Sequence, residues 1–246
     1  MVRRDVKSRY AGSRFGVLWS FLNPLVQLAS YALIFGYVYR PAEGTERGPF
    51  LAALFCGLWS WWAFQEGTMR GLTSLVDQAP LLKRAPLPAE LCIAAAVTAS
   101  FVLQTLGFCL SLAVFAAAGL IEPSARLALL PAGMLLGLAL TVSVALVLAP
   151  IYLVVRDTIN VVTAALTLGF FASPVLYRIE ALPEHLRPLA ELNPLSGVIG
   201  LYRLAVLGIP LSSATPIAIG IGAFVVCWAV GSLFLSRLAG LLDEYW

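Results

Sequence analysis

Side chains that could carry out chemistry are few in this chain of 246 residues, and they form no recognisable catalytic set. His185 is the only histidine, and its acidic neighbours in a loop are Glu180 and Glu184. An enzyme would need acid, base or metal-binding groups clustered in a site, and three loop residues are a weak cluster. The cysteines lack the C-x-x-C spacing and are expected to be small packing residues: Cys56, Cys92, Cys109 and Cys227. We therefore expect no catalytic residue and no metal site.

The sequence also lacks the residues that hold ATP phosphates or relay protons. Its only Lys-Ser/Thr pair is Lys7-Ser8, and no glycine precedes it, so there is no G-x-x-x-x-G-K-[ST] loop. Acidic residues and histidine do not recur within the apolar runs as a proton relay would require. If the chain moves a solute uphill, the energy must come from a partner, and we expect no cofactor on the chain itself.

Composition places most of the chain in a membrane. The residues are 60% hydrophobic and 12% charged, and the mean hydropathy is +0.90. Soluble domains are about one quarter charged, so polar groups cannot cover this surface and most of it must face lipid. The net charge is +3, and the basic residues are scattered between apolar runs, so nucleic acid is not expected as a partner.

Six apolar segments approach the length of about 20 residues that a helix needs to cross a bilayer. We expect an all-α membrane protein that forms one domain over 1–246, with short re-entrant or interfacial helices at 177–213 on the outer face. Within that region 194–207 is apolar but short; if it spanned, there would be seven spans and the C-terminus would lie outside. The expected spans are 20–39, 50–67, 89–118, 127–155, 159–176 and 216–235.

The opening segment is the most basic stretch of the chain and predicts its orientation. Basic residues beside a span favour the cytoplasmic side, and six spans place ten of the sixteen Lys and Arg there. We therefore expect both termini in the cytoplasm. Over 1–19 the segment could be an amphipathic interface helix on the inner leaflet, or a plain basic flank. Its cations are Arg3, Arg4, Lys7, Arg9 and Arg14.

Two cytoplasmic turns could contact another protein. The loop 78–90 contains three prolines that predict one or two helical turns between fixed breaks: Pro80, Pro86 and Pro88. Its middle could be a docking surface or a plain connecting loop: Leu81, Leu82, Lys83 and Arg84. The turn between the fourth and fifth spans could hold a local ion pair or a second contact point, formed by Arg156 and Asp157.

An ordered set of motifs along the whole chain resembles one family. The opening RDVK and RY, then LW and NP, resemble the start of the permease subunits of ABC-2 type polysaccharide exporters, which carry O-antigen, capsule and teichoic acid precursors. Three later pieces agree in order: the loop PLLKRAPLPAE, the pair Arg156-Asp157, and SPVLY followed by LRPLAELNPLSGVIGLYR. The ordered set is far more specific than any single piece.

The resemblance implies an architecture and a set of partners. Residues 3–15 would form a gate helix at the cytoplasmic entrance, 81–84 would lie in the coupling helix that docks on an ATPase subunit, and 183–207 would form short periplasmic helices. The family works as a homodimer of the permease with two copies of a separate P-loop ATPase, which holds ATP and Mg²⁺. The two permease copies enclose a channel for a lipid-linked glycan in the bacterial cytoplasmic (inner) membrane.

Aromatic side chains in the spans are candidates for lining such a glycan path, because sugar rings stack on aromatic faces and can slide along them. Trp and Tyr also form interfacial belts, and Phe faces lipid, so each position has an ordinary alternative. The three indoles of the WSWW run cannot all face one side of a helix. The candidates are Tyr31, Phe35, Trp59, Trp61, Trp62, Phe64, Phe170, Phe171 and Tyr177.

These observations predict a six-span permease subunit of an ATP-driven exporter of lipid-linked polysaccharide, with ATP hydrolysis in the separate ATPase. Two alternatives remain open. The first is an ABC-2 exporter of a drug or small lipid, and the second is an intramembrane glycosyl or acyl transferase built around His185, Glu180 and Glu184.

Overall fold

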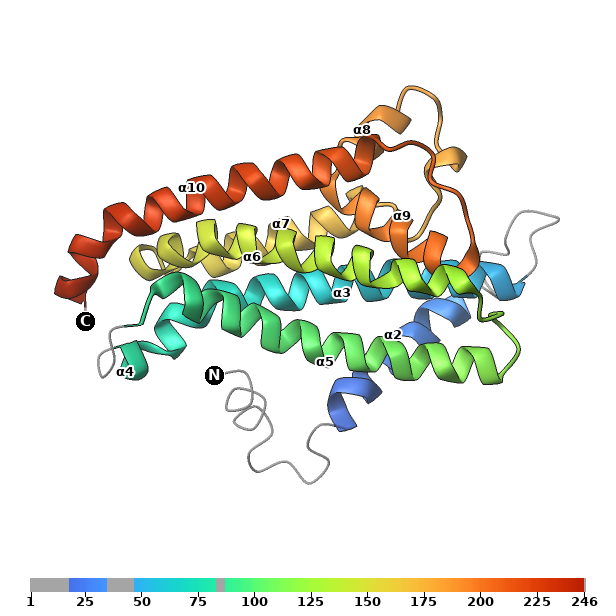
Figure 1. Cartoon of the computed structure of the whole chain (residues 1–246), viewed down its shortest axis with the longest axis horizontal. Coiled ribbons are helices and arrows are strands. Elements are labelled where there is room, and N and C mark those ends of the chain that lie inside the picture. Colours follow the sequence, from blue (N-terminus) through green and yellow to red (C-terminus); the bar gives the residue numbers. More distant parts are fainter. Residues whose placement is uncertain (1–17, 35–46, 83–86, 246) are drawn as a thin grey trace.

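The computed structural model describes residues 18–34, 47–82 and 87–245, and all regular structure in these ranges is helical, which confirms the all-α class. Long helices lie side by side along one axis, with the short helices between residues 179 and 207 at one end and the single helical turn at 79–82 at the other (Figure 1). The elements are α2 (Leu18–Leu33), α3 (Arg47–Asp77), α4 (Ala79–Leu82), α5 (Ala89–Ala117), η2 (Ala125–Leu129), α6 (Leu130–Val154), α7 (Thr158–Ala172), η3 (Ile179–Ala181), α8 (Arg187–Glu191), α9 (Pro194–Leu207) and α10 (Thr215–Tyr245).

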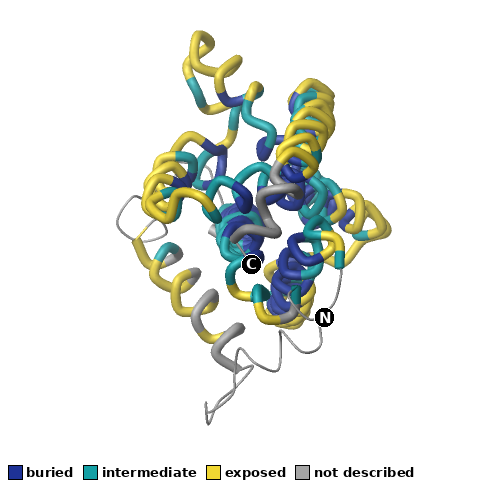
Figure 2. Tube along the Cα trace, turned by 90° about the vertical axis from the view of Figure 1, so that its left-hand side faces the viewer, coloured by how far each residue is buried: buried dark blue, intermediate teal, exposed yellow. Residues whose placement is uncertain are grey.

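The long helix α3 passes through the middle of the bundle, where it contacts α2, α5, α6, α7 and α9. Buried residues gather at the centre of the end-on view and exposed residues face outward (Figure 2). The helix is buried because large apolar side chains surround its axis, among them Phe55, Trp59, Leu72 and Leu75. It therefore positions the side chains of every neighbouring helix.

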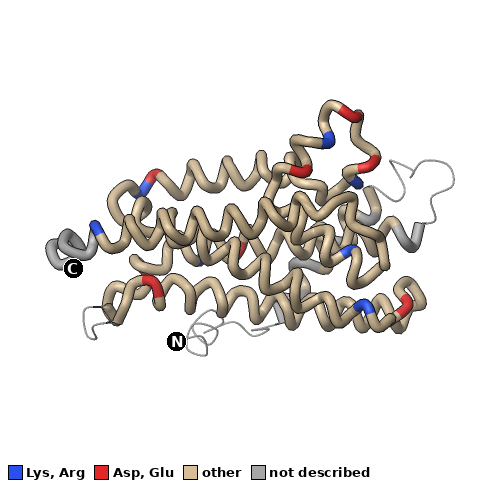
Figure 3. The backbone as a smooth tube through the Cα atoms, turned by 45° about the horizontal axis from the view of Figure 1, so that its top comes forward, with Lys and Arg blue, Asp and Glu red and all other residues tan. Residues whose placement is uncertain are grey.

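Three helical stretches within the described residues are long and apolar enough to cross a membrane: Ala89–Ala117, Ala125–Val154 and Thr215–Arg237. Helices α2 and α7 are shorter, with 16 and 15 residues, and α3 is long but carries Gln65, Glu66 and Arg70. Charged residues lie mostly near the two ends of the bundle (Figure 3). This arrangement suits a membrane protein, and the number of six spans stays a prediction.

Helix α3 continues to Asp77, well beyond the predicted span 50–67. Glu66 does not end it, because its carboxylate accepts a hydrogen bond from the Gln104 side chain of α5. Beyond that point Leu72 and Leu75 are fully buried, so the last turns still pack on the core. After α3, the single turn α4 confirms the helical turn predicted beside Pro80.

Helix α7 is shorter than predicted, because it ends at Ala172 rather than at 176. Ser173 precedes Pro174 and is extended, with φ −91° and ψ 148°, as the proline ring requires of the residue before it.

Helix α9 has the bounds read from the sequence, Pro194–Leu207, and both of its ends are capped. The Asn193 side chain accepts from the Leu195 N–H at 3.0 Å, and Gly208 is left-handed with φ 67°. Nine of its residues are buried, and it packs against α3, α6 and α10. The helix is thus buried in protein, and its re-entrance into the membrane stays a prediction.

Gly71 of α3 offers a test of the central packing. A Cβ at this position would collide with the Ala145 side chain of α6 and lie 2.9 Å from Val97 of α5. We expect Gly71→Leu to lower the free energy of unfolding by about 3 kcal/mol, because the three helices would have to separate. Thermal unfolding in detergent measures the loss. Gly222→Leu is the control, since a Cβ there meets nothing within 4 Å, and equal losses would contradict this packing.

Candidate functional site

A row of aromatic rings joins α2, α3 and α7. The Phe170 ring lies 6.1 Å from Tyr31, 5.8 Å from Trp61 and 5.1 Å from Phe171, and Trp61 lies 5.9 Å from Phe64. Trp61 and Phe64 are three residues apart, so both project from one side of α3. We call Tyr31, Trp61, Phe64, Phe170 and Phe171 the aromatic row; all five belong to the set predicted for a glycan path.

Burial differs sharply within the aromatic row. Trp61 is 3% exposed, whereas Phe171 is 65% exposed and projects from the end of α7. The Trp61 ring fits against α7 because position 169 is glycine, where a Cβ would lie 3.1 Å from the indole. Trp61 therefore packs beneath the other rings of the aromatic row, and Phe171 is its most exposed ring.

Trp59 belongs to a different cluster. It is 1% exposed and packs with Phe55 and Phe108, at 5.4 and 6.1 Å, while its indole N–H donates to the Gln104 carbonyl at 2.8 Å. Phe108 in turn stacks edge-on against Tyr202 of α9. Trp59 is thus enclosed within a single copy of the chain, and its place along a glycan path stays a prediction. Trp62 is half-buried beside Trp59, at 5.8 Å.

The outward side of α7 carries hydroxyl groups that the sequence reading missed. Thr163 and Thr167 are exposed, and their hydroxyls donate to the carbonyls of Ile159 and Thr163 at 2.7 and 2.9 Å. These bonds satisfy the donors and leave oxygen lone pairs facing out. The four-residue spacing continues to Phe171, so all three lie along one side. This four-residue spacing of threonines inside a predicted span is the sequence pattern from which the hydroxyl surface could have been predicted. We call Thr163, Thr167 and Phe171 the α7 stripe.

Arg203 of α9 connects this helix to α3 and to the loop that follows α7. It is 7% exposed and donates to three carbonyl oxygens: Nε to Ala53 at 3.3 Å, Nη1 to Tyr177 at 3.1 Å and Nη2 to Val175 at 3.0 Å. A Cβ at Gly57 would lie 2.6 Å from the Val175 oxygen, so only glycine lets this loop approach α3. No sequence pattern indicated that Arg203 would be buried.

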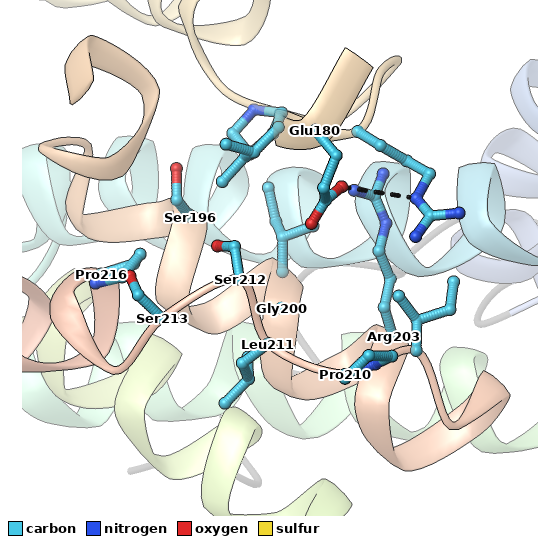
Figure 4. Close-up of a pocket in the computed structure, with 14 residues that line it drawn as sticks. Glu180, Ser196, Gly200, Arg203, Pro210, Leu211, Ser212, Ser213 and Pro216 are labelled. Carbon is cyan, nitrogen blue, oxygen red and sulfur yellow. Dashed lines mark ion pairs between the residues drawn. The ribbon is translucent and has the colours of Figure 1, made fainter. Parts of the chain in front are cut away.

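Tyr177 is half-buried in the same loop. Its hydroxyl donates to the Ala172 carbonyl at 3.2 Å, and burial raises the pKa of its phenol. The pocket beside this loop has a volume of about 40 Å³ and is lined by Arg203, Ser196, Ser213 and Glu180 (Figure 4). That space suits a few water molecules and is too small for a sugar ring.

At the opposite end of the bundle lie the residues predicted to contact an ATPase. Leu82 is half-buried and packs on the core, and Arg156 lies over the Tyr152 ring at 5.1 Å. Arg156 and Asp157 are both exposed and form no ion pair within the described part of the chain, so of the two alternatives for this turn the local ion pair is not formed and the contact point stays a prediction. The remaining candidate residues lie outside the part of the chain that the structure describes: Arg3, Arg4, Lys7, Arg9, Arg14, Phe35, Lys83 and Arg84. The side chain of Leu81 is not described either.

The residues considered for transferase chemistry do not come together as a site. Glu180 pairs with Arg178 at 3.5 Å on an exposed loop, and His185 and Glu184 are exposed. In the described ranges, no three His, Cys, Asp or Glu residues lie close enough to hold a metal ion. Glu180, Glu184 and His185 therefore form no compact cluster in the described structure.

The described structure is a bundle of helices, three of which are long and apolar enough to cross a membrane, and α7 exposes aromatic and hydroxyl side chains. The family model for the ABC-2 type transporter matches residues 1–207, and the chain belongs to this family. It is 32% identical over 96% of its length to the O-antigen export system permease protein RfbA of Myxococcus xanthus, 90% of which is covered. It is also 24% identical over 82% of its length to RfbA of Klebsiella pneumoniae, 77% of which is covered.

Proposed function

We propose that this chain is the membrane-spanning permease subunit of an ATP-driven exporter that moves a lipid-linked, O-antigen-like polysaccharide across the bacterial cytoplasmic membrane. The observation that carries the proposal is the 32% identity over 96% of the chain to an O-antigen export permease, within a family match that covers most of the chain. ATP and Mg²⁺ would be bound by a separate P-loop ATPase, and this chain would make and break no bonds.

The glycan path would run along the α7 stripe and the aromatic row. Helix α10 gives the contrast that supports this choice, because the large exposed side chains along its middle are apolar, among them Ile221, Val225 and Trp228. Such a face suits lipid. The α7 stripe combines hydroxyl oxygens with an open ring face, which suits sugar hydroxyls and the C–H faces of sugar rings.

A second copy of the chain would close the path. Val161 and Leu168 of α7 are 67% and 72% exposed beside the threonines of the α7 stripe. A surface that mixes apolar and small polar side chains favours association between helices in a membrane. Two copies facing each other through α2 and α7 would enclose the hydroxyls between them, away from lipid.

The orientation follows from the same proposal. The end that holds α4, Arg156 and Asp157 would face the cytoplasm, where an ATPase could dock on residues 81–84. The end that holds η3, α8 and α9 would face outward. Closure of the ATPase pair on ATP would then move α3 and α5 through the loop that joins them.

The direct biochemical test is co-purification. Affinity purification of the full chain in mild detergent should bring down a P-loop ATPase in equal amount. Absence of such an ATPase from preparations that retain folded permease would overturn the proposal.

Phe171→Ala separates a role in the path from a role in folding. Phe171 is 65% exposed, so its truncation should change the unfolding temperature by no more than about 2 °C. Loss of the stacking surface should lower glycan export several-fold, measured as surface polysaccharide in complemented cells. The control is Trp228→Ala on α10, which should leave export unchanged. Equal export in both variants would remove Phe171 from the path and favour a smaller cargo.

A further inference from the structure

An apolar groove opens between α6 and α10 at the end of the bundle where α6 terminates. Its volume is about 470 Å³. Apolar walls of this kind would not hold water, and the volume is well above what a few water molecules fill. The walls include Pro150 and Val154 of α6, Val155 directly after it, and Leu233, Phe234 and Arg237 of α10.

The groove exists because the two helices touch tightly just before it. A Cβ at Gly231 would lie 2.6 Å from the Leu146 Cβ and 2.8 Å from the Leu146 carbonyl carbon, so the backbones are in contact there. Beyond this point α6 ends at Val154, whereas α10 continues to Tyr245 and extends past it (Figure 1). The space that opens between them is left unfilled by either helix.

The walls face outward from the bundle. Val154, Val155, Leu233 and Phe234 are 53%, 51%, 54% and 45% exposed. In a bilayer, side chains with this exposure meet hydrocarbon, which enters any apolar gap open to it. The apolar walls of the groove therefore favour binding of a hydrocarbon chain.

Arg237 supplies a charge at the mouth of the groove. It lies two residues beyond the expected span 216–235, whose 20 residues measure about 30 Å at a rise of ~1.5 Å per residue. This is close to the hydrocarbon thickness of about 30 Å, so the guanidinium reaches the level of the headgroups. The Arg237 side chain is exposed and makes no ion pair or hydrogen bond with any residue that the structure describes.

We propose that the α6–α10 groove binds one acyl chain of an anionic phospholipid of the surrounding membrane, with the lipid phosphate on Arg237. A guanidinium binds a phosphate through two parallel N–H donors, and the groove holds the tail of the same molecule. The site lies between α6 and α10, apart from the α7 stripe. It requires only that the bundle spans a membrane, and it does not depend on the cargo.

Native mass spectrometry of the purified full chain tests the site, with added phosphatidylglycerol or phosphatidylcholine of identical acyl chains. Phosphatidylglycerol should be retained as one molecule per chain, at least five-fold more than phosphatidylcholine. Arg237→Gln should remove that preference. Leu233→Trp, which fills the groove from an exposed position, should lower retention of both lipids.

Arg156→Gln is the matched control, because Arg156 is exposed at the same end and does not line the groove. It should retain phosphatidylglycerol as the unchanged chain does. The proposal is wrong if the two lipids are retained equally, if Arg237→Gln keeps the preference, or if Arg156→Gln loses as much. It is also wrong if retention follows a polyprenyl lipid carrier instead of phosphatidylglycerol.

Discussion

Arg203→Met should lower the free energy of unfolding by about 2–6 kcal/mol. The methionine side chain preserves most of the volume and removes every donor. The loop carbonyls of Val175 and Tyr177 then lose the N–H groups that Arg203 gives them at 3.0 and 3.1 Å. A buried acceptor left without a donor costs about 1–3 kcal/mol, and two such acceptors give the expected loss. The measurement is thermal unfolding of the purified chain in detergent.

A positive charge at position 203 should not by itself restore the stability that Arg203→Met loses. Arg203→Lys keeps the charge, but one ammonium group cannot reproduce three donors spread over a planar guanidinium, so it should also unfold early. Arg178→Met is the matched control at the same end, because its ion pair with Glu180 is about half exposed and contributes less than about 1 kcal/mol. If Arg203→Met unfolds at the wild-type temperature, or if Arg178→Met loses as much stability, the role assigned to Arg203 is wrong.

Reversing two charges in the 81–84 turn should have the largest effect on transport. In a chain with Lys83→Glu and Arg84→Glu, we expect glycan export and permease-stimulated ATPase activity to fall at least ten-fold. The proposed docking surface would then present two negative charges to a partner shaped for positive ones, and a like-charge contact at an interface costs several kcal/mol. Surface polysaccharide and phosphate release by the co-purified ATPase measure the two effects.

Arg178→Glu is the control for this reversal. It changes an exposed charge at the opposite end of the bundle and should leave both activities near the wild-type values. Normal export together with normal ATPase stimulation in the 83–84 double variant would exclude the turn as the coupling element.

The helices follow from the sequence wherever local signals are strong. Helix α9 begins after Asn193 and ends before Gly208, as its capping residues predict. Helix α5 likewise has nearly the predicted bounds. The end of α7 was misjudged because the apolar run continues past Ser173, whereas the backbone is redirected by Pro174. Helix α3 continues past Glu66, whose carboxylate accepts a hydrogen bond from Gln104 of another helix, and no local pattern contains that contact.

The sequence predicted which types of residue form the candidate site, but only partly where each side chain lies in the fold. Trp59 and Trp61 are two positions apart on α3, which turns their side chains to nearly opposite sides of the helix. The sequence therefore indicated that these indoles diverge, but it could not say which of them faces α5 and which faces α7. Arg203 was beyond prediction because its partners are backbone carbonyls, which every residue has. The threonines of the α7 stripe carry no aromatic ring, and only their four-residue spacing within an apolar run points to them.

Transport in a reconstituted membrane tests the central claim most directly. Vesicles would contain this chain and its co-purified P-loop ATPase, with lipid-linked polysaccharide extracted from the source membrane. Addition of ATP and Mg²⁺ outside should carry the glycan into the lumen, where added glycosidases cannot reach it. Vesicles with the ATPase alone should show no such protection. A glycan that stays fully accessible despite ATP hydrolysis by the complex would contradict the account.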